Sequence, residues 1–371
     1  MSIPLFRIYH DEEDSEIVKN VIESGKNWAI GEYNDTFEKM LANYFERNYA
    51  ISFNSGTSAL FSLLLAYGIK NGDEVIVPSF TFISTANSVL MAGGKPVFAD
   101  IELECLGLEP EDVVEKITPK TKTIIPVHYA GCPCKIKELK EIAEDYNLLL
   151  LEDAAESFGA RINDKKVGSF GDSAMLSFCQ NKIITTGEGG AIVTDSEEIY
   201  EKLKLIRSHG RLEKTNYFTS NDGFSYIQLG YNFRLSNILA ALGVSQLKKV
   251  DLIIKKRQEK AKYYNNLLDD ISFIEPLKPP RSYFHVYQLY SIFVKEGKRQ
   301  IVIDTLKEHK IASKIYFDPV HLSPFYKKLF GTKSPVLQNT ERVSEEILSL
   351  PFHPEIKEEE MLLIKGVLDK I

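Results

Sequence analysis

The stretch "SFCQNKIITTGEGGAIVTD", from Ser177 to Asp195, places one lysine between two short apolar runs. A loop with three glycines separates Lys182 from the second run. Apolar runs bounded by glycine and polar residues are typical of buried strands. A lysine in partly apolar surroundings is a better nucleophile toward a carbonyl carbon than a lysine in water. We therefore predict that Lys182 holds an aldehyde cofactor through an imine.

The sequence around this stretch predicts an α/β fold. Between about residues 50 and 195, short apolar runs alternate with stretches that have apolar residues at helical spacing. Residues 74–78, 95–100 and 148–153 are expected to be strands, and residues 57–67, 81–94 and 135–146 are expected to be helices. Strands that alternate with helices indicate a mostly parallel sheet covered by helices on both faces.

The length of 371 residues fits about two domains. A long helix is expected over residues 236–270, and a second strand–helix pattern follows it. We predict a large domain over residues 1–250 and a smaller α/β domain over residues 251–371. The basic run "KKRQEKAK", residues 255–262, is interpreted as a solvated helix face.

Composition argues against several classes of partner. The net charge of −7 and the pI near 5.7 argue against a nucleic-acid surface, which needs a basic excess. The apolar stretches are too short to cross a membrane, and the first residues show no secretory signal. The four cysteines do not resemble a disulfide framework in a chain of this length. We expect a reduced, cytoplasmic enzyme that binds neither nucleic acid nor membrane.

Two more clusters come at the expected carboxyl ends of strands, where ligands bind in open α/β sheets. In "ISFNSGTSAL", the residues Gly56, Thr57 and Ser58 open a helix, whose free N–H groups could bind phosphate. An N-cap with a tight glycine turn explains the same residues. In "LLLLEDAAESFGA", Asp153 ends an apolar strand, where a carboxylate needs a partner. A protonated ring nitrogen, a nearby lysine or a helix N-terminus could each serve.

The order of these features narrows the alternatives. A phosphate site, a carboxylate and an amine follow one another along the chain. Pyridoxal 5'-phosphate requires an anion site for its phosphate, a carboxylate for its ring nitrogen and an amine for its aldehyde. We therefore expect this cofactor.

The chain resembles the DegT/DnrJ/EryC1/StrS family of sugar aminotransferases, which have the fold-type I architecture of aspartate aminotransferase. The resemblance covers nearly the whole chain, from "IPLFRIY" to "LSLPFHPEI". It is carried by the motifs "NSGTSAL", "GDEVIVPSFTFISTAN", "KPVFADI", "PVHYAG", "EDAAESFGA", "SFCQNKIITTGEGGAIVTD" and "GYNFRLSNILAALG".

The resemblance implies a role for each matching residue. Lys182 and Asp153 are the catalytic residues, at the Schiff-base position and at the pyridine nitrogen. Glu156 reaches the ring hydroxyl, and Phe82 stacks on the ring. The cofactor phosphate is bound by Gly56, Thr57, Ser58 and Ser177. Asn232 reaches the phosphate of the neighbouring subunit's cofactor, which implies a homodimer with shared active sites, and Arg234 meets an anionic substrate or donor.

The resemblance also implies the reaction. An amino group moves from glutamate to a nucleotide-linked keto sugar with ping-pong kinetics. The phrase "NKIITTGEGG" resembles enzymes that aminate C4 of 4-keto-6-deoxy sugars for amino-sugar and surface polysaccharide biosynthesis. The alternatives are a C3 aminotransferase, a nucleotide-sugar 3-dehydratase, which often has histidine at the lysine position, or a non-catalytic regulatory protein of the same fold.

Neither the cysteines nor the histidines indicate a metal. Cys132 and Cys134 form the only close pair, and Cys105 and Cys179 are distant from it in sequence. A C-x-C pair has poor spacing for a four-cysteine cluster. The seven histidines show no H-x-x-x-H spacing. We predict no metal, and cysteines that belong to loops or the core.

Overall fold

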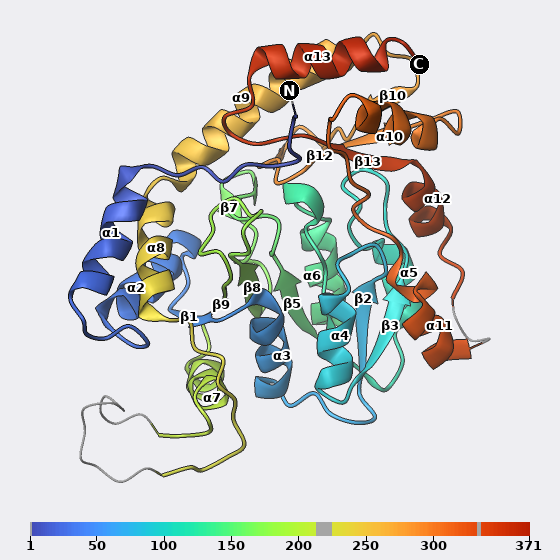
Figure 1. The fold of residues 1–371 in the computed structure, drawn as a ribbon. Helices are drawn as coiled ribbons and strands as arrows, with labels where there is room; N and C mark the ends of the chain where they lie inside the picture. The colour runs from blue at the N-terminus through green and yellow to red at the C-terminus, as the bar shows by residue number, and fades with distance from the viewer. Residues whose placement is uncertain (1, 213–224, 332–334) are drawn as a thin grey trace.

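The computed structural model describes residues 2–212, 225–331 and 335–371. Figure 1 shows a large sheet with helices around it and a smaller unit above. The described helices are α1 (Glu12–Glu23), α2 (Glu32–Phe45), α3 (Gly56–Ala66), α4 (Ser84–Met91), α5 (Pro110–Lys116), α6 (Ile136–Asp145), α7 (Glu197–Arg207), α8 (Asn237–Lys248), α9 (Val250–Leu268), α10 (Arg299–Glu308), α11 (Pro324–Phe330), α12 (Gln338–Glu346) and α13 (Glu358–Leu368), with short 3-10 turns η1 (Tyr129–Gly131) and η2 (Val320–Leu322).

The described strands form three sheets. Their bounds are β1 (Tyr49–Phe53), β2 (Glu74–Pro78), β3 (Lys95–Ala99), β4 (Thr121–Ile124), β5 (Leu149–Asp153), β6 (Arg161–Ile162), β7 (Lys165–Lys166), β8 (Ser173–Ser177), β9 (Gly190–Thr194), β10 (Ile274–Pro276), β11 (Tyr283–Phe284), β12 (Tyr290–Val294) and β13 (Ile347–Leu350).

The central sheet has the strand order β1-β9-β8-β5-β4-β2-β3. Its pairs β2–β3, β2–β4, β4–β5 and β5–β8 are parallel, whereas β9 runs antiparallel to both of its neighbours. The predicted α/β fold with a mostly parallel sheet is therefore confirmed. The parallel strands bring their carboxyl ends to one edge of the sheet.

Alternation along the strands fills two separate cores. Ile76 belongs to the core on the face covered by α2, α6 and α8, whereas its neighbours Val75 and Val77 belong to the core under α3, α4 and α7. Successive side chains of a strand point to opposite faces, so a strand buried on both faces is a continuous apolar run. This explains the sequence "EVIVP" of β2.

A second unit contains the antiparallel sheet β10-β12-β13. Its own core includes residues of α9, α10 and α13, together with Ile3 from the start of the chain. Ile3 pairs with Ile311, and Figure 1 shows both chain ends in this unit. Val320 and Tyr326, by contrast, pack in a core of the large sheet. The chain thus crosses between the units near both ends, and a boundary at residue 250 stays a prediction.

The helical stretch predicted over residues 236–270 is two helices separated by one residue. Lys249, with φ −107° and ψ 7°, separates α8 from α9. The helical spacing of apolar residues continues across this break because both helices pack on the same core, so the sequence pattern does not reveal it.

The interpretation of residues 255–262 as a solvated face is wrong for Arg257. This side chain is 3% exposed, and its Nη1 donates to the carbonyl oxygen of Tyr287 at 2.9 Å. The neighbouring Lys255 and Lys262 are exposed. A charged run on a helix can therefore place one member toward the core, where backbone carbonyls satisfy the guanidinium group.

Within the described ranges, no helix combines the length and the apolar character needed to cross a membrane.

Candidate active site

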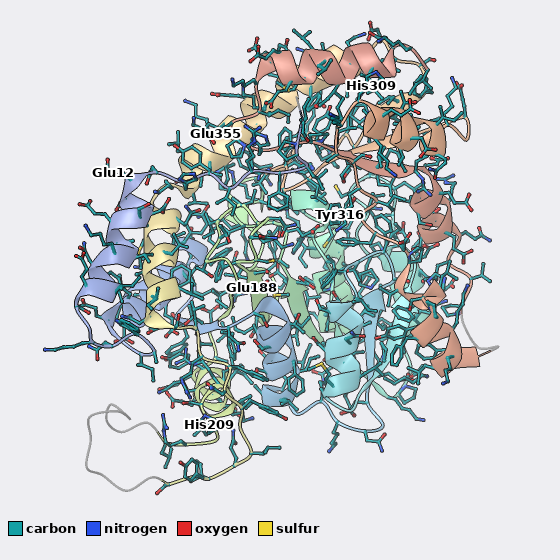
Figure 2. All side chains as sticks on the ribbon, in the orientation of Figure 1. Glu12, Glu188, His209, His309, Tyr316 and Glu355 are labelled. Carbon is teal, nitrogen blue, oxygen red and sulfur yellow. The ribbon has the colours of Figure 1, made fainter. Side chains whose placement is uncertain are left out.

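A cavity of about 370 Å³ lies at the carboxyl ends of β2, β5 and β8. Three residues that follow α10, namely Lys314, Tyr316 and Phe317, line it from the side of the second unit. Figure 2 labels two of the lining residues, Glu188 over the sheet and Tyr316 above it. The cavity thus lies between the two units, at the sheet edge where the sequence predicted a ligand.

Asp153 brings a buried carboxylate to this cavity. The side chain is 3% exposed and belongs to the last residue of β5. Thr85 Oγ1 donates to its Oδ2 at 2.9 Å, and the backbone N–H of Ala155 donates to its Oδ1 at 3.2 Å. Burial raises the pKa of Asp153, although these hydrogen bonds and the positive charge of Lys182 oppose the rise. A cation in the cavity would stabilise the ionised form of Asp153.

Lys182 lies opposite a second carboxylate. Its Nζ is 3.3 Å from Oε1 of Glu156, and both side chains are largely buried. Oε2 of Glu156 accepts a hydrogen bond from the backbone N–H of Ala130 at 3.0 Å. Both Lys182 and Glu156 line the cavity. The lysine amine and the carboxylate of Asp153 therefore line the same cavity.

The turn before α3 brings backbone N–H groups to the wall of the cavity. Gly56 and Thr57 begin the helix, where backbone N–H groups have no carbonyl one turn earlier. Both residues line the cavity together with Ser55 and Ser177. A Cβ on Gly190 would lie 2.5 Å from the carbonyl oxygen of Ser55, so glycine is required where β9 passes the turn. The N-terminus of α3 is thus directed at the cavity, as an anion site requires.

Phe82 offers an aromatic ring to the cavity. It belongs to the loop between β2 and α4, lines the cavity, and has a side chain that is 59% exposed. Its ring centroid is 6.1 Å from that of Phe317. An exposed ring beside a buried carboxylate and an amine is suited to covering a flat ligand.

Three of the predicted site residues are not among the described residues that line the cavity. The hydroxyl of Ser58 donates to Oδ1 of Asn54 at 2.6 Å, and its N–H is capped by Ser55 Oγ. The backbone oxygen of Asn232 accepts a weak bond from the Asn54 side chain at 3.5 Å. Arg234 Nη1 donates to Ser208 Oγ at 3.1 Å. The roles implied for Ser58, Asn232 and Arg234 stay predictions.

Sequence reasoning missed other residues of the site. Thr85 holds the Asp153 carboxylate, and Lys314 and Tyr316 close the cavity from the second unit. The position of Thr85 in the first turn of α4, after a strand end, could have indicated it. The sequence holds no signal for Lys314 and Tyr316, because they are brought to the site only by packing between the two units.

Three of the four cysteines are buried away from this cavity. Cys132 Sγ lies 2.6 Å from Cys105 Sγ, although the two residues are distant in sequence, and Cys134 is also buried. Cys179 is partly exposed and lines the cavity. Across the described residues there is no group of three or more His, Cys, Asp or Glu side chains that could hold a metal ion.

The side chains present match the chemistry of pyridoxal phosphate. The cavity presents an amine for an aldehyde, a buried carboxylate for a ring nitrogen, N–H groups for a phosphate and an exposed ring for stacking. The carboxylate in particular is buried with no lysine or arginine of the described residues within 4 Å of it. A positively charged group of a ligand would pair with this buried carboxylate.

Comparison with known proteins agrees with this chemistry. Residues 9–369 match the DegT/DnrJ/EryC1/StrS aminotransferase family. The chain belongs to this family. It is an aminotransferase with the fold-type I architecture, and the expectation from the sequence is confirmed for the family, the fold and the class of enzyme.

Several relatives and solved structures match at least 95% of the chain. The GDP-perosamine synthase of Vibrio cholerae is 36% identical over 355 residues, which cover 95% of this chain and 94% of that protein. The structure of Helicobacter pylori PseC, an aminotransferase involved in the biosynthesis of pseudoaminic acid, has a TM-score of 0.94 at 31% identity and covers 100% of this chain and 99% of that chain. NtdA from Bacillus subtilis with bound cofactor PMP has a TM-score of 0.86 at 29% identity and covers 97% of this chain and 81% of that chain.

Proposed function

We propose that this aminotransferase binds pyridoxal 5'-phosphate and moves an amino group from glutamate to C4 of a nucleotide-linked 4-keto-6-deoxy sugar. The pathway is amino-sugar and surface polysaccharide biosynthesis. One observation carries the proposal: Lys182 and Asp153 line one cavity, from the ends of two adjacent parallel strands and the loop that follows. The names of the relatives support the substrate class, since perosamine and pseudoaminic acid are amino sugars.

The cofactor, when bound, supplies an aldehyde that exchanges amines and a ring that takes up negative charge from the substrate carbon. The carboxylate of Asp153 would keep the ring nitrogen protonated, because a nearby opposite charge favours the charged form of each group. Thr85 and the N–H of Ala155 fix the direction of that carboxylate. The backbone N–H groups of Gly56 and Thr57 would hold the phosphate.

Lys182 performs the proton transfer. As general base and acid, its Nζ would take the proton from the substrate carbon and deliver it to the former aldehyde carbon, on the other side of the nitrogen. Glu156 keeps this amine near the cavity through the 3.3 Å contact of Oε1. Phe82 would cover one face of the ring and exclude water from the reacting atoms.

Residues outside the cavity lead us to propose a homodimer. Asn232 and Arg234 are not among the described residues that line the cavity of their own chain. A second subunit could bring Asn232 and Arg234 to the cavity, where they would add hydrogen-bond donors for phosphate and substrate. Co-expression of a Lys182→Ala chain with an Asn232→Ala chain tests this: a shared site predicts that mixed dimers regain activity that neither variant has alone, and no recovery would contradict it.

The reaction itself is tested with purified protein, glutamate and a panel of 3-keto and 4-keto nucleotide sugars. The expected result is a 4-amino sugar and 2-oxoglutarate in equal amounts. Product from a 3-keto sugar alone would show C3 amination instead, and loss of water without amine transfer would show a 3-dehydratase. Reduction of the cofactor-loaded protein with borohydride is expected to label Lys182, and a label on another lysine would refute the proposed role.

A further inference from the structure

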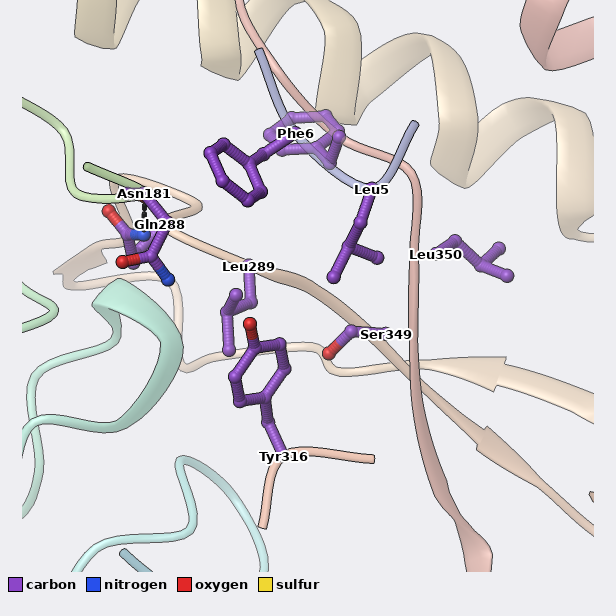
Figure 3. A pocket seen from close by; sticks show the side chains of 9 residues that line it. Leu5, Phe6, Asn181, Gln288, Leu289, Tyr316, Ser349 and Leu350 are labelled. Atoms are coloured by element: carbon purple, nitrogen blue, oxygen red, sulfur yellow. Dashed lines mark hydrogen bonds between the residues drawn. The ribbon is translucent and has the colours of Figure 1, made fainter. Parts of the chain in front are cut away.

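The loop that carries Lys182 is held by the second unit through one side chain. Gln288 lies in the segment between β11 and β12 and is 3% exposed. Its Nε2 donates a hydrogen bond to the carbonyl oxygen of Asn181, the residue before Lys182. Figure 3 shows this bond, with the Gln288 amide turned toward Asn181 beside a cavity of about 10 Å³. The peptide group that joins Asn181 to Lys182 is thereby fixed from outside its own domain.

The same segment also supports the carboxylate that faces the lysine amine. The backbone N–H of Leu289 donates to the carbonyl oxygen of Ala130 at 3.2 Å. The N–H of Ala130 in turn donates to Oε2 of Glu156 at 3.0 Å, and Oε1 of Glu156 is 3.3 Å from Nζ of Lys182. Gln288 thus bonds directly to the lysine loop, and Leu289 bonds to the residue whose N–H donates to Glu156.

This segment is itself rigidly held. Arg257 of α9 is buried, and its Nη1 donates to the carbonyl oxygens of Tyr287 at 2.9 Å and Gln288 at 3.4 Å. A Cβ on Gly131 would lie 2.8 Å from the backbone nitrogen of Gln288, so the turn η1 approaches the segment as closely as a glycine allows. Close packing against two elements makes the segment a fixed support for the lysine loop.

We infer that Gln288 is a positioning residue for Lys182, acting through the carbonyl group of Asn181. It is not among the described residues that line the larger cavity, and its effect is on the direction in which the amine enters that cavity. Because a displacement of about 1 Å at a reacting group lowers rates strongly, the contact is expected to act on turnover more than on substrate binding. The role of Lys182 in this inference rests on the proposed function.

The variant Gln288→Met tests the contact, since it keeps the length of the side chain and removes the donor. Gln258→Met is the matched control. Gln258 also donates from Nε2 to a backbone carbonyl, that of His285 at 3.2 Å, and not to a residue of the lysine loop. Hydrogen–deuterium exchange of residues 179–184 is measured in the cofactor-free protein, and kcat and KM are measured in the loaded enzyme.

Gln288→Met is expected to raise exchange over residues 179–184 and to lower kcat, each by about tenfold, as loss of one buried hydrogen bond predicts. KM should change by less than about twofold. Gln258→Met should alter neither quantity. Gln288→His retains a side-chain N–H and should keep exchange within about twofold of the wild type.

Equal exchange in Gln288→Met and the wild type would overturn the inference, and so would equal increases in Gln288→Met and Gln258→Met. An increase in Gln288→His as large as in Gln288→Met would also overturn it, because the effect would then follow shape instead of the donor. If borohydride reduction does not label Lys182 in the wild type, the proposed function fails, and the exchange experiment still decides whether Gln288 holds this loop.

Discussion

Two neighbouring carboxylates at the end of β5 have opposite surroundings. Glu152 is fully buried and is not among the residues that line the cavity. It accepts four hydrogen bonds, from His128 Nε2 at 3.0 Å and from the backbone N–H groups of Gly168, Phe170 and Gly171 at 2.7, 2.8 and 2.7 Å. Burial by itself raises the pKa of Glu152, but these bonds outweigh it and the pKa is lowered.

Asp153, one residue later, points to the cavity with only the hydrogen bonds from Thr85 and Ala155 among the described residues. At Asp153 the two hydrogen bonds do not outweigh the effect of burial, so the pKa of Asp153 is raised. Alternation along a strand thus directs one carboxylate to hydrogen-bond donors of the chain and the next to the cavity. The comparison teaches that a buried acid is structural when the chain itself supplies all of its donors.

The largest expected effect is on stability at Glu152. Glu152→Ala leaves His128 and three backbone N–H groups buried without an acceptor, so the free energy of unfolding should fall by about 3–5 kcal/mol. The midpoint of urea unfolding of the cofactor-free protein measures this. Glu198→Ala, which breaks an exposed pair with Lys202, is the control and should leave the midpoint unchanged. An unchanged midpoint in Glu152→Ala would show that the chain does not depend on this carboxylate.

The next effect is on catalysis at Asp153. Asp153→Asn keeps the shape of the side chain but removes the negative charge that would stabilise the protonated ring nitrogen. The value of kcat/KM should therefore fall about 10²–10³-fold. Circular dichroism of the variant should match that of the wild type. If the variant retains activity within about fivefold, Asp153 does not face the ring nitrogen and the contrast with Glu152 is lost.

A smaller effect is expected at Thr85. Thr85→Val removes the hydroxyl that donates to Asp153 while keeping the shape, and activity should fall about 10- to 100-fold because a hydrogen bond to a charged group contributes about 1.5–3 kcal/mol. Thr123→Val is the matched control, since the hydroxyl of Thr123 is buried and has no partner within the described residues. Steady-state kinetics of Thr85→Val and Thr123→Val measure the effect. An equal loss of activity in the two variants would assign it to packing and not to the hydrogen bond.

The smallest effect is a pH dependence of opposite sign at the two acids in the cofactor-free protein. Glu152 has a lowered pKa, so it stabilises the fold above its ordinary value of 4.5 and loses this contribution as pH falls. Asp153 has a raised pKa, so it destabilises the fold at neutral pH and ceases to do so below its ordinary value of 3.8.

Urea unfolding between pH 3 and pH 7 therefore should show two trends. Glu152→Gln should be less stable than the wild type at pH 7, with a gap that narrows below about pH 4.5. Asp153→Asn should be more stable than the wild type at pH 7, with an advantage that disappears toward pH 3.8. Parallel trends in the two variants would show that both acids have the same kind of environment.

Much of the site could be predicted from local sequence because its parts come at strand ends. Lys182, Asp153, Gly56 and Phe82 each follow an apolar run, and parallel strands bring such positions to one edge of the sheet. The break at Lys249 and the burial of Arg257 could not be predicted, because helical spacing and charge look the same on exposed and packed faces.

The sequence by itself determined the α/β class and the family and predicted the acid and amine of the candidate site, since these depend on local patterns of apolar, glycine and charged residues. Only the tertiary structure decided which carboxylate of Glu152 and Asp153 is satisfied by the chain, and that Gln288 reaches the lysine loop. The physical reason is that hydrogen-bond partners from distant segments meet only after the two units have packed together.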